Sequence, residues 1–359
     1  MAGIKVRKGM PSVQLDKPEF KKRFLARFYD PAFEPLAREL DKIAETAWTA
    51  YDEYHKSPRT QKAGKGFADP DFAVPIEWLQ TRANIQAAEA AHKNAASPSR
   101  ILIINGSSRN DQTCPGEISK TWRMVSLAKQ VIENTPGFQV DILDLSRLSA
   151  EYGKVIYPCK ACVSTAQPLC HWPCSCYPNH ALGQSGDWMA EIYPKWVAAH
   201  GVMIVCPVNW YQAPSSLKLM IDRLVCADGG NPDLSSTGGK DPTKAKRLEL
   251  AGWPYPRHLA GRVFSVVVHG DAAGTENLRR ILSDWMSDIG MIPSGHLALI
   301  DRYVGYLTPY ATSHDDLDKD VDFQEDVRNA ALTLVQAVKD GRSGKLQPAD
   351  RGLREARPK

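Results

Sequence analysis

Five of the eight cysteines in this chain fall within 18 residues. They are spaced Cys159-x2-Cys162-x7-Cys170-x3-Cys174-x-Cys176, whereas the other three are scattered. Thiolates bind iron–sulfur clusters and zinc, and thiols exchange with disulfides. In a chain without secretion signals, such a cluster indicates metal or redox chemistry before it indicates a disulfide framework.

A second polar segment has the composition of a phosphate site. The letters GSSR at 106–109 follow an apolar run directly, and SKT at 119–121 opens the next helical stretch. Hydroxyls, an arginine fork and backbone N–H groups at a helix N-terminus bind a phosphate monoester. A dinucleotide site would need G-x-G-x-x-G, and a P-loop would need glycine where Ser119 stands before the lysine. The segment therefore predicts a hydroxyl-lined phosphate cup, the alternative being a loop that only turns the chain.

Two further polar segments follow apolar runs. One is CPVNWYQAPSSLK at 206–218, and the other is HGDAAG at 269–274. Trp210 and Tyr211 offer an aromatic surface for a flat ring, or they simply pack at the end of a strand. His269 either contacts a ligand or is a hydrogen-bonded structural histidine.

The elements around these segments predict an α/β fold. Apolar runs of strand length lie at 101–104, 138–145, 202–207, 262–269 and 297–303, with helical stripes between them. Five strands alternating with helices predict a doubly wound parallel sheet. Because such sheets bind ligands at loops that leave the carboxyl ends of strands, we expect the polar loops at one edge.

The pattern of apolar residues divides the rest of the chain into further segments. Residues 1–99 show helical spacing without a strand pattern and predict an N-terminal helical extension. The sheet domain is expected over 100–341, with 227–259 as a lid or subunit-contact insertion, because that stretch is too long for an ordinary connection. Residues 342–359 are expected to form a basic, flexible tail.

Charge and hydropathy exclude some classes of protein. The net charge is +4, and residues 341–359 account for that excess with six basic and two acidic side chains. The body is therefore close to neutral, which argues against a nucleic-acid face. No window approaches the roughly 20 apolar residues of a membrane helix, and the first residues lack the apolar stretch of a signal peptide. These features predict a cytoplasmic protein.

Residues 206–223 resemble the NADPH-dependent FMN reductase family of flavodoxin-like oxidoreductases. The family pattern runs from a proline and an aromatic residue through a short polar loop to P-x-x-L-K-x-x-x-D-R, which stands here at 214–223. With the segments at 106–109 and 269–274, the resemblance covers residues 100–340. It implies a flavodoxin-like fold, FMN as cofactor and NADPH or NADH as co-substrate.

The resemblance also implies a role for each loop. It assigns the FMN phosphate to Ser107, Arg109, Ser119 and Thr121 with Ser108 and Lys120 beside them, the isoalloxazine ring to Pro207, Val208, Asn209, Trp210 and Tyr211, and its pyrimidine end to His269, Gly270, Asp271 and Gly274. One departure is the longer spacing from Arg109 to Ser119, which leaves the distal phosphate ligands open. No side chain is expected to act as a proton-transfer catalyst, because the flavin carries the chemistry.

Iron–sulfur flavoproteins of the same superfamily carry four cysteines for a [4Fe–4S] cluster just after strand two, where the cysteines of this chain fall. The resemblance therefore makes Cys159, Cys162, Cys170, Cys174 and Cys176 candidate metal ligands. The seven residues between Cys162 and Cys170 exceed the spacing of that family. Zinc, with His171 or His180, and free or redox-active thiols are the alternatives.

We therefore expect an FMN-dependent NAD(P)H oxidoreductase that passes hydride to FMN and on to a small acceptor such as a quinone or a free flavin. The alternative is an electron carrier like the iron–sulfur flavoproteins, and a third class is a scaffold whose flavin site has decayed. The resemblance also implies a homodimer or homotetramer.

Overall fold

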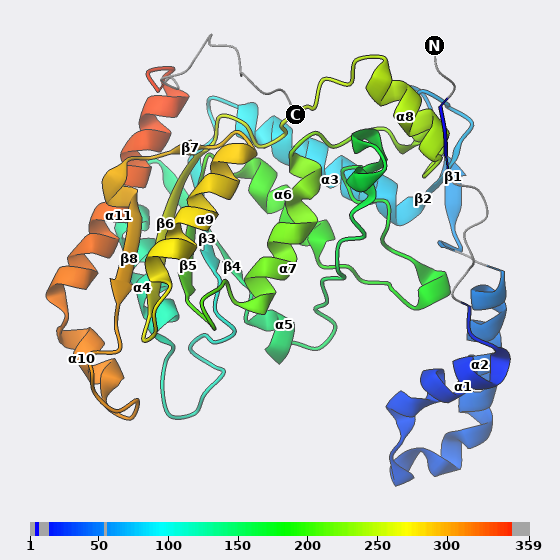
Figure 1. The fold of residues 1–359 in the computed structure, drawn as a ribbon, viewed down its shortest axis with the longest axis horizontal. Coiled ribbons are helices and arrows are strands. Elements are labelled where there is room, and N and C mark those ends of the chain that lie inside the picture. Colours follow the sequence, from blue (N-terminus) through cyan, green and yellow to red (C-terminus); the bar gives the residue numbers. More distant parts are fainter. Residues whose placement is uncertain (1–3, 7–13, 54–55, 347–359) are drawn as a thin grey trace.

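The computed structural model describes residues 4–6, 14–53 and 56–346, so the predicted tail lies outside the described residues from 347 onward. At its centre is a parallel sheet with helices on both faces (Figure 1). The strands are β3 (Ser99–Asn105), β4 (Phe138–Asp144), β5 (Gly201–Pro207), β6 (Val263–Gly270), β7 (Ile292–Pro293) and β8 (Leu299–Tyr303). Their order is β4-β3-β5-β6-β7, with β8 also paired to β6. This order confirms the predicted doubly wound α/β class.

The described sheet has six strands rather than the predicted five. The additional strand, β7, has two residues and pairs with Val263 and Phe264 at the start of β6. The longer β8 pairs with β6 further along, from Val266 to Gly270. A two-residue strand carries no detectable side-chain period, which is why the sequence pattern did not predict it.

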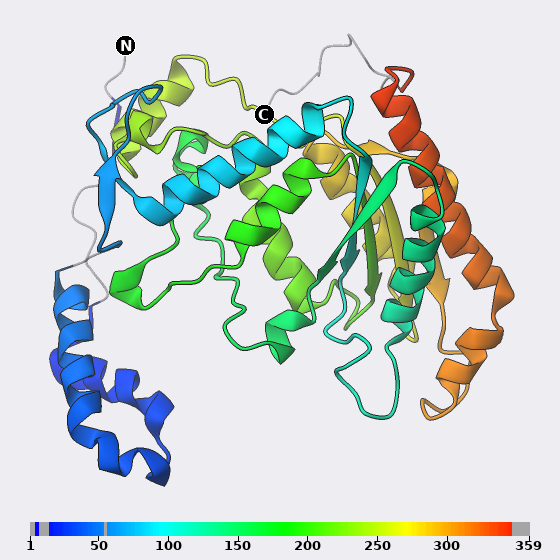
Figure 2. The ribbon, with the colours of Figure 1, turned by 180° about the vertical axis from the view of Figure 1, so that it is seen from behind.

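Two helical layers cover the sheet, and the alternation of side chains along the strands supplies both cores (Figure 2). The helices α4 (Lys120–Glu133) and α11 (Val321–Arg342) cover the face to which Ile101, Ile103 and Val205 point. The helices α6 (Met189–Ala198), α7 (Ser215–Arg223) and α9 (Thr275–Asp288) cover the face of Leu102 and Ile104. The short helix α5 (Arg147–Ala150) follows β4, and the short helix α10 (Ser313–Lys319) precedes α11.

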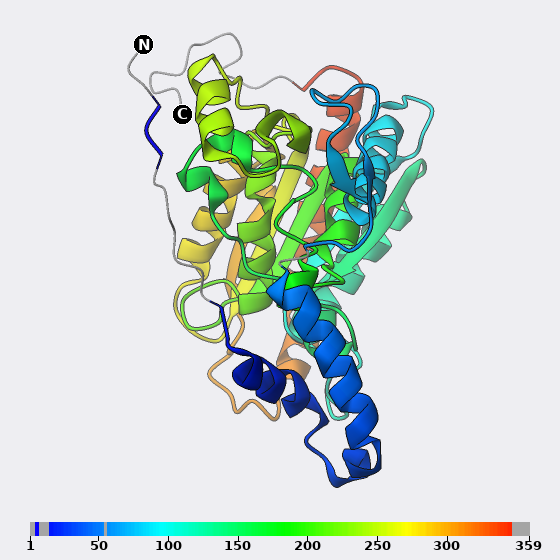
Figure 3. The same ribbon diagram turned by 90° about the vertical axis from the view of Figure 1, so that its right-hand side faces the viewer.

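The extension contains α1 (Lys17–Leu25), α2 (Ala37–Asp52) and α3 (Ile76–Lys93). The first two helices project from the body (Figure 3), whereas α3 packs along α6. Ile85 of α3 is fully buried in the core of the sheet domain. The structure differs from the prediction of an extension without strands, because β1 (Thr60–Lys62) and β2 (Ala73–Pro75) form an antiparallel pair. Three-residue strands are too short to give a readable alternation.

The insertion at 227–259 has its own helix, α8 (Pro242–Leu250), and packs on the cysteine segment. The backbone of Asn231 accepts from Trp172 N (3.1 Å) and donates to Cys170 O (2.7 Å). The predicted role of this insertion as a lid or subunit contact stays a prediction.

Candidate functional site

The loops after β3, β5 and β6 leave the same edge of the sheet. The three strands are neighbours and run parallel, so their last residues, Asn105, Pro207 and Gly270, lie along one edge. The register pairs Pro207 with His269 and Asn105 with Val205. The structure thus brings together the three polar segments found in the sequence.

The first loop is held by Asn105, a residue that sequence reasoning did not single out. Its Nδ2 donates to Arg109 O (3.0 Å) and to Asp144 Oδ1 (2.7 Å), and its Oδ1 accepts from Ser107 N (3.2 Å). Arg109 N in turn donates to Ser107 Oγ (3.1 Å). These bonds fix a tight turn and leave the side chains of Ser108 and Arg109 exposed.

Gly106 is required for close packing at the start of this loop. A Cβ at this position would lie 2.7 Å from Cys206 Cβ and 3.0 Å from Leu217 Cδ2. The absence of a side chain therefore lets the turn approach β5 and α7 closely.

The segment at 119–121 begins α4. Ser119 is the N-cap, and its Oγ accepts from Trp122 N (3.4 Å). Lys120 Nζ donates to Val304 O (3.0 Å), so this ammonium is directed to the chain that follows β8. Ser119 is buried and caps the helix, whereas the side chain of Arg109 is exposed at the same loop.

His269, near the end of β6, is buried and hydrogen-bonded to Thr121 in the first turn of α4. Its Nε2 lies 2.8 Å from Thr121 Oγ1, and both side chains are almost fully buried. Burial lowers the pKa of His269 to about 4, with Lys120 acting in the same direction. The imidazole is therefore neutral at physiological pH and joins two of the three loops.

The second loop presents its two aromatic residues to solvent. Asn209 and Gln212 exchange two backbone hydrogen bonds of 3.0 Å, which makes Trp210 and Tyr211 the central pair of a hairpin turn. Both have positive φ, 49° and 66°, a conformation that residues other than glycine and asparagine rarely adopt. Trp210 is 93% exposed and Tyr211 is 59% exposed. The turn therefore holds two large rings out of the core at a conformational cost.

The third loop packs directly on the second. Gly274 has φ 110°, and a Cβ there would lie 3.2 Å from Tyr211 Cα. A Cβ on Gly270 would lie 3.3 Å from Val208 Cβ. Asp271 is exposed beside this contact, and a hydrogen bond with Asp271 raises the pKa of Tyr310. The two glycines thus allow the third loop to approach the aromatic turn.

The residues at this edge fit FMN. Exposed Arg109 and Ser108 beside the N-terminus of α4 supply the cation and donors that a phosphate monoester needs. The exposed rings of Trp210 and Tyr211 supply apolar surface for a flat ring system. The hydroxyl oxygens of the buried Ser107, Ser119 and Thr121 are engaged within the chain and hold the loops in place. The predicted contacts thus divide into exposed groups and groups that support them.

The cysteine segment lies between β4 and α6, away from these three loops in sequence. All eight cysteines are free thiols. Cys162 is central, because its hydrogen bond with Cys170 raises its pKa and its Sγ accepts from Lys240 Nζ (3.4 Å). Cys170 is buried, whereas Cys162 is partly exposed.

The described residues do not form the predicted metal ligand set. Within 4–6, 14–53 and 56–346, no group of three or more His, Cys, Asp or Glu side chains is arranged to hold a metal ion. Of the two histidines named with the zinc alternative, His171 has both ring nitrogens engaged, with Ser175 Oγ at 2.5 Å and Thr237 Oγ1 at 2.9 Å, and His180 Nε2 lies 3.2 Å from Glu77 Oε1. Metal binding by the five cysteines stays a prediction from resemblance.

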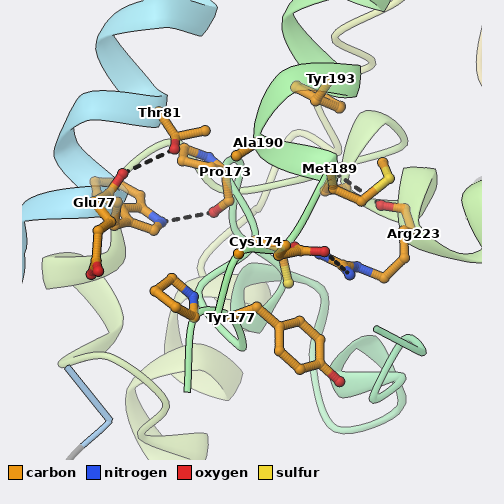
Figure 4. Close-up of a pocket in the computed structure, with 14 residues that line it drawn as sticks. Glu77, Thr81, Pro173, Cys174, Tyr177, Met189, Ala190, Tyr193 and Arg223 are labelled. Atoms are coloured by element: carbon orange, nitrogen blue, oxygen red, sulfur yellow. Dashed lines mark hydrogen bonds and ion pairs between the residues drawn. The ribbon is translucent and has the colours of Figure 1, made fainter. Parts of the chain in front are cut away.

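A buried ion pair behind the cysteine segment has no signal in the sequence. Arg223 Nη2 lies 2.5 Å from Asp187 Oδ2, and Nη1 lies 3.0 Å from Oδ1. Burial opposes the charge of Arg223, but the bond to Asp187 raises its pKa above the ordinary value. Figure 4 shows Arg223 reaching toward Cys174 and Tyr177 in a cavity of about 290 Å³. Asp222, which precedes Arg223 in the motif at 214–223, pairs with Lys218 (2.5 Å) on the surface of α7.

A family model described as NADPH-dependent FMN reductase matches residues 99–304. An iron-sulfur flavoprotein from Methanosarcina thermophila is 29% identical over 127 residues, which are 35% of this chain and 52% of that protein. The chain thus spans about half the length of this curated relative. All three polar loops lie inside the range that the family model matches.

Two solved structures that match this chain have low sequence identity to it. A structure of RosB with a bound 8-demethyl-8-formylriboflavin-5'-phosphate intermediate has a TM-score of 0.47 and 12% identity, covering 69% of this chain and 82% of that chain. An NAD(P)H:quinone oxidoreductase from Methanothermobacter marburgensis has a TM-score of 0.37 and 15% identity, covering 69% and 98%. None of the helices in the described part of the chain combines the length and apolar run that crossing a bilayer requires.

Proposed function

Because the chain belongs to the NADPH-dependent FMN reductase family, we propose that it is an FMN-dependent oxidoreductase that uses NADH or NADPH to reduce a small acceptor such as a quinone or a free flavin. The observation that carries this proposal is the meeting of three polar loops at one sheet edge inside the matched range. When bound, FMN supplies hydride acceptance and electron transfer. The protein supplies binding, orientation and exclusion of water.

In this proposal the exposed groups of the three loops bind the cofactor. Arg109 and Ser108 would hold the phosphate, and the rings of Trp210 and Tyr211 would cover one part of the ring system and keep water from it. Asn105 keeps the first loop folded, and neutral His269 ties that loop to β6 through Thr121. No side chain at this edge is assigned a proton-transfer step.

The experiment is a visible absorption spectrum of the purified full chain, followed by assays of NADH and NADPH oxidation with a quinone and with free FMN as acceptors. Two resolved flavin bands, release of FMN on denaturation and acceptor-dependent nicotinamide oxidation are expected. A chain that does not bind added FMN, or a flavin-loaded chain that oxidises neither nicotinamide, would refute the proposal. Size-exclusion chromatography with light scattering tests the accompanying proposal of a homodimer or homotetramer.

A second candidate is an electron carrier with an iron–sulfur cluster. It is favoured by the similarity to the iron-sulfur flavoprotein and by five cysteines within 18 residues. Its test is iron and sulfide analysis of protein purified without oxygen, with the Cys159→Ser/Cys162→Ser variant as comparison. Stoichiometric iron that this variant loses would support the carrier, and an iron-free parent would refute it.

A further inference from the structure

A second cavity lies beside the cysteine segment, between the extension and the insertion at 227–259. It measures about 310 Å³, which is at the lower end of the size of small-molecule sites. Its walls include the aromatic rings of Phe72, Trp78 and Tyr177 and the side chain of Leu234. Trp78, Tyr177 and Leu234 are almost fully buried, so the walls are formed by core side chains rather than by mobile surface groups.

Two lysines, Lys56 and Lys240, line this apolar cavity. Lys56 Nζ donates to the backbone oxygen of Ser175, and Lys240 Nζ donates to Leu169 O (2.6 Å) and Cys162 Sγ (3.4 Å). In the part of the chain that the structure describes, neither ammonium forms an ion pair with a carboxylate. Each lysine is therefore fixed in position by neutral acceptors, and each keeps at least one N–H free.

Two positive charges in one partly buried cavity repel each other, and neutral acceptors compensate them only in part. A negatively charged group in the cavity would offset both charges, and a flat apolar body would fill the space between the aromatic walls. We propose that this cavity is a second ligand site, which binds a small organic anion with a carboxylate on a planar apolar body.

This site is separate from the cofactor edge. Its lining comes from residues 56–78, 175–178 and 234–240, and none of the residues predicted to contact FMN belongs to it. Lys56 lies in the extension and Lys240 in the insertion, so both regions outside the sheet contribute one charge each. The extension and the insertion thus share a role at a site that is independent of any reductase activity.

The test is isothermal titration calorimetry of the purified full chain with naphthalene-2-carboxylate, and with naphthalene-2-methanol as its neutral analogue. The acid is expected to bind at least about tenfold more tightly than the alcohol, because it adds charge-assisted hydrogen bonds. Lys56→Met and Lys240→Met should each weaken binding of the acid at least about tenfold. Lys65→Met, which removes an exposed charge from the same extension, should leave it unchanged.

Lys240→Arg guards against misfolding, because it keeps the charge and should retain binding of the acid. The free energy of unfolding in urea is measured in every variant, and Lys240→Arg and Lys65→Met should stay close to the parent. Equal binding of acid and alcohol, or parental binding of the acid by the Lys56→Met/Lys240→Met variant, would overturn the proposal. Iron bound by the cysteines would overturn it as well, since an anionic cluster would already compensate both lysines.

Discussion

Removing the carboxylate of Asp187 should destabilise the protein strongly, because it leaves Arg223 buried without its counter-ion. The Arg223 side chain is 1% exposed and that of Asp187 is 10% exposed. After Asp187→Ala, the guanidinium would keep one hydrogen bond, to the backbone oxygen of Tyr157 at 2.7 Å, because its Nε has no hydrogen-bond partner among the described residues. Removing one member of a buried pair costs about 3–5 kcal/mol.

The neighbouring residue provides a matched control. Asp222 precedes Arg223 on the same helix and pairs with Lys218, but these side chains are 46% and 59% exposed. Exposed pairs contribute about 1 kcal/mol or less, so Asp222→Ala should change the free energy of unfolding by no more than that. The comparison removes the same chemical group from two ion pairs that differ in burial.

The assay is equilibrium unfolding in urea, monitored by circular dichroism on flavin-free samples so that cofactor binding does not contribute to the measured stability. Asp187→Ala/Arg223→Met should recover part of the loss, because the uncompensated charge is then absent. Equal losses for Asp187→Ala and Asp222→Ala would refute the reasoning. A double variant no more stable than Asp187→Ala would show that packing, rather than charge, sets the cost.

Three further predictions concern the cofactor edge. Arg109→Ala should weaken FMN binding about tenfold or more, measured by flavin fluorescence, because it removes a charge-assisted phosphate contact; unchanged affinity would place the phosphate elsewhere. The folded chain excludes a proton from His269 down to about pH 4, whereas the unfolded chain binds it below about pH 6.5. The free energy of unfolding therefore falls as the pH falls, and by about pH 5 the parent should lose about 2 kcal/mol. His269→Gln should not show this loss when both proteins are unfolded in urea, and equal losses would contradict the assignment. Trp210→Asn/Tyr211→Gly should leave stability unchanged or raise it by about 1 kcal/mol, because Asn-Gly suits the turn, while FMN affinity falls; a fall in stability would mean that the rings also support the fold.

The sheet was predictable because its strands are continuous apolar runs buried on both faces, as at 201–207 and 263–270. Strand ends place loops by topology alone, so the meeting of the three polar loops also followed from sequence. The hydrogen-bond partners inside each loop could not be predicted from the sequence. In the sequence pattern Asn105 is only the last residue of a strand. Asp187 lies 36 residues before Arg223 in irregular chain, so no local period connects these two residues. The contact between the insertion and the cysteine segment is equally non-local, since Asn231 meets Cys170 across 61 residues of sequence that give no pairing signal.

Because of helix α3, the folded domain begins earlier in the chain than the range matched by the family model. The family match begins at residue 99, yet Ile85 is enclosed by the sheet domain and Trp78 Nε1 donates to Pro173 O (2.8 Å). A protein cut at residue 99 would expose the apolar surface of α6 that α3 covers. Part of the core of the sheet domain is thus supplied by a helix that lies outside the range matched by the family model. A truncated protein that begins at residue 99 would therefore be an aggregation-prone fragment rather than a minimal enzyme.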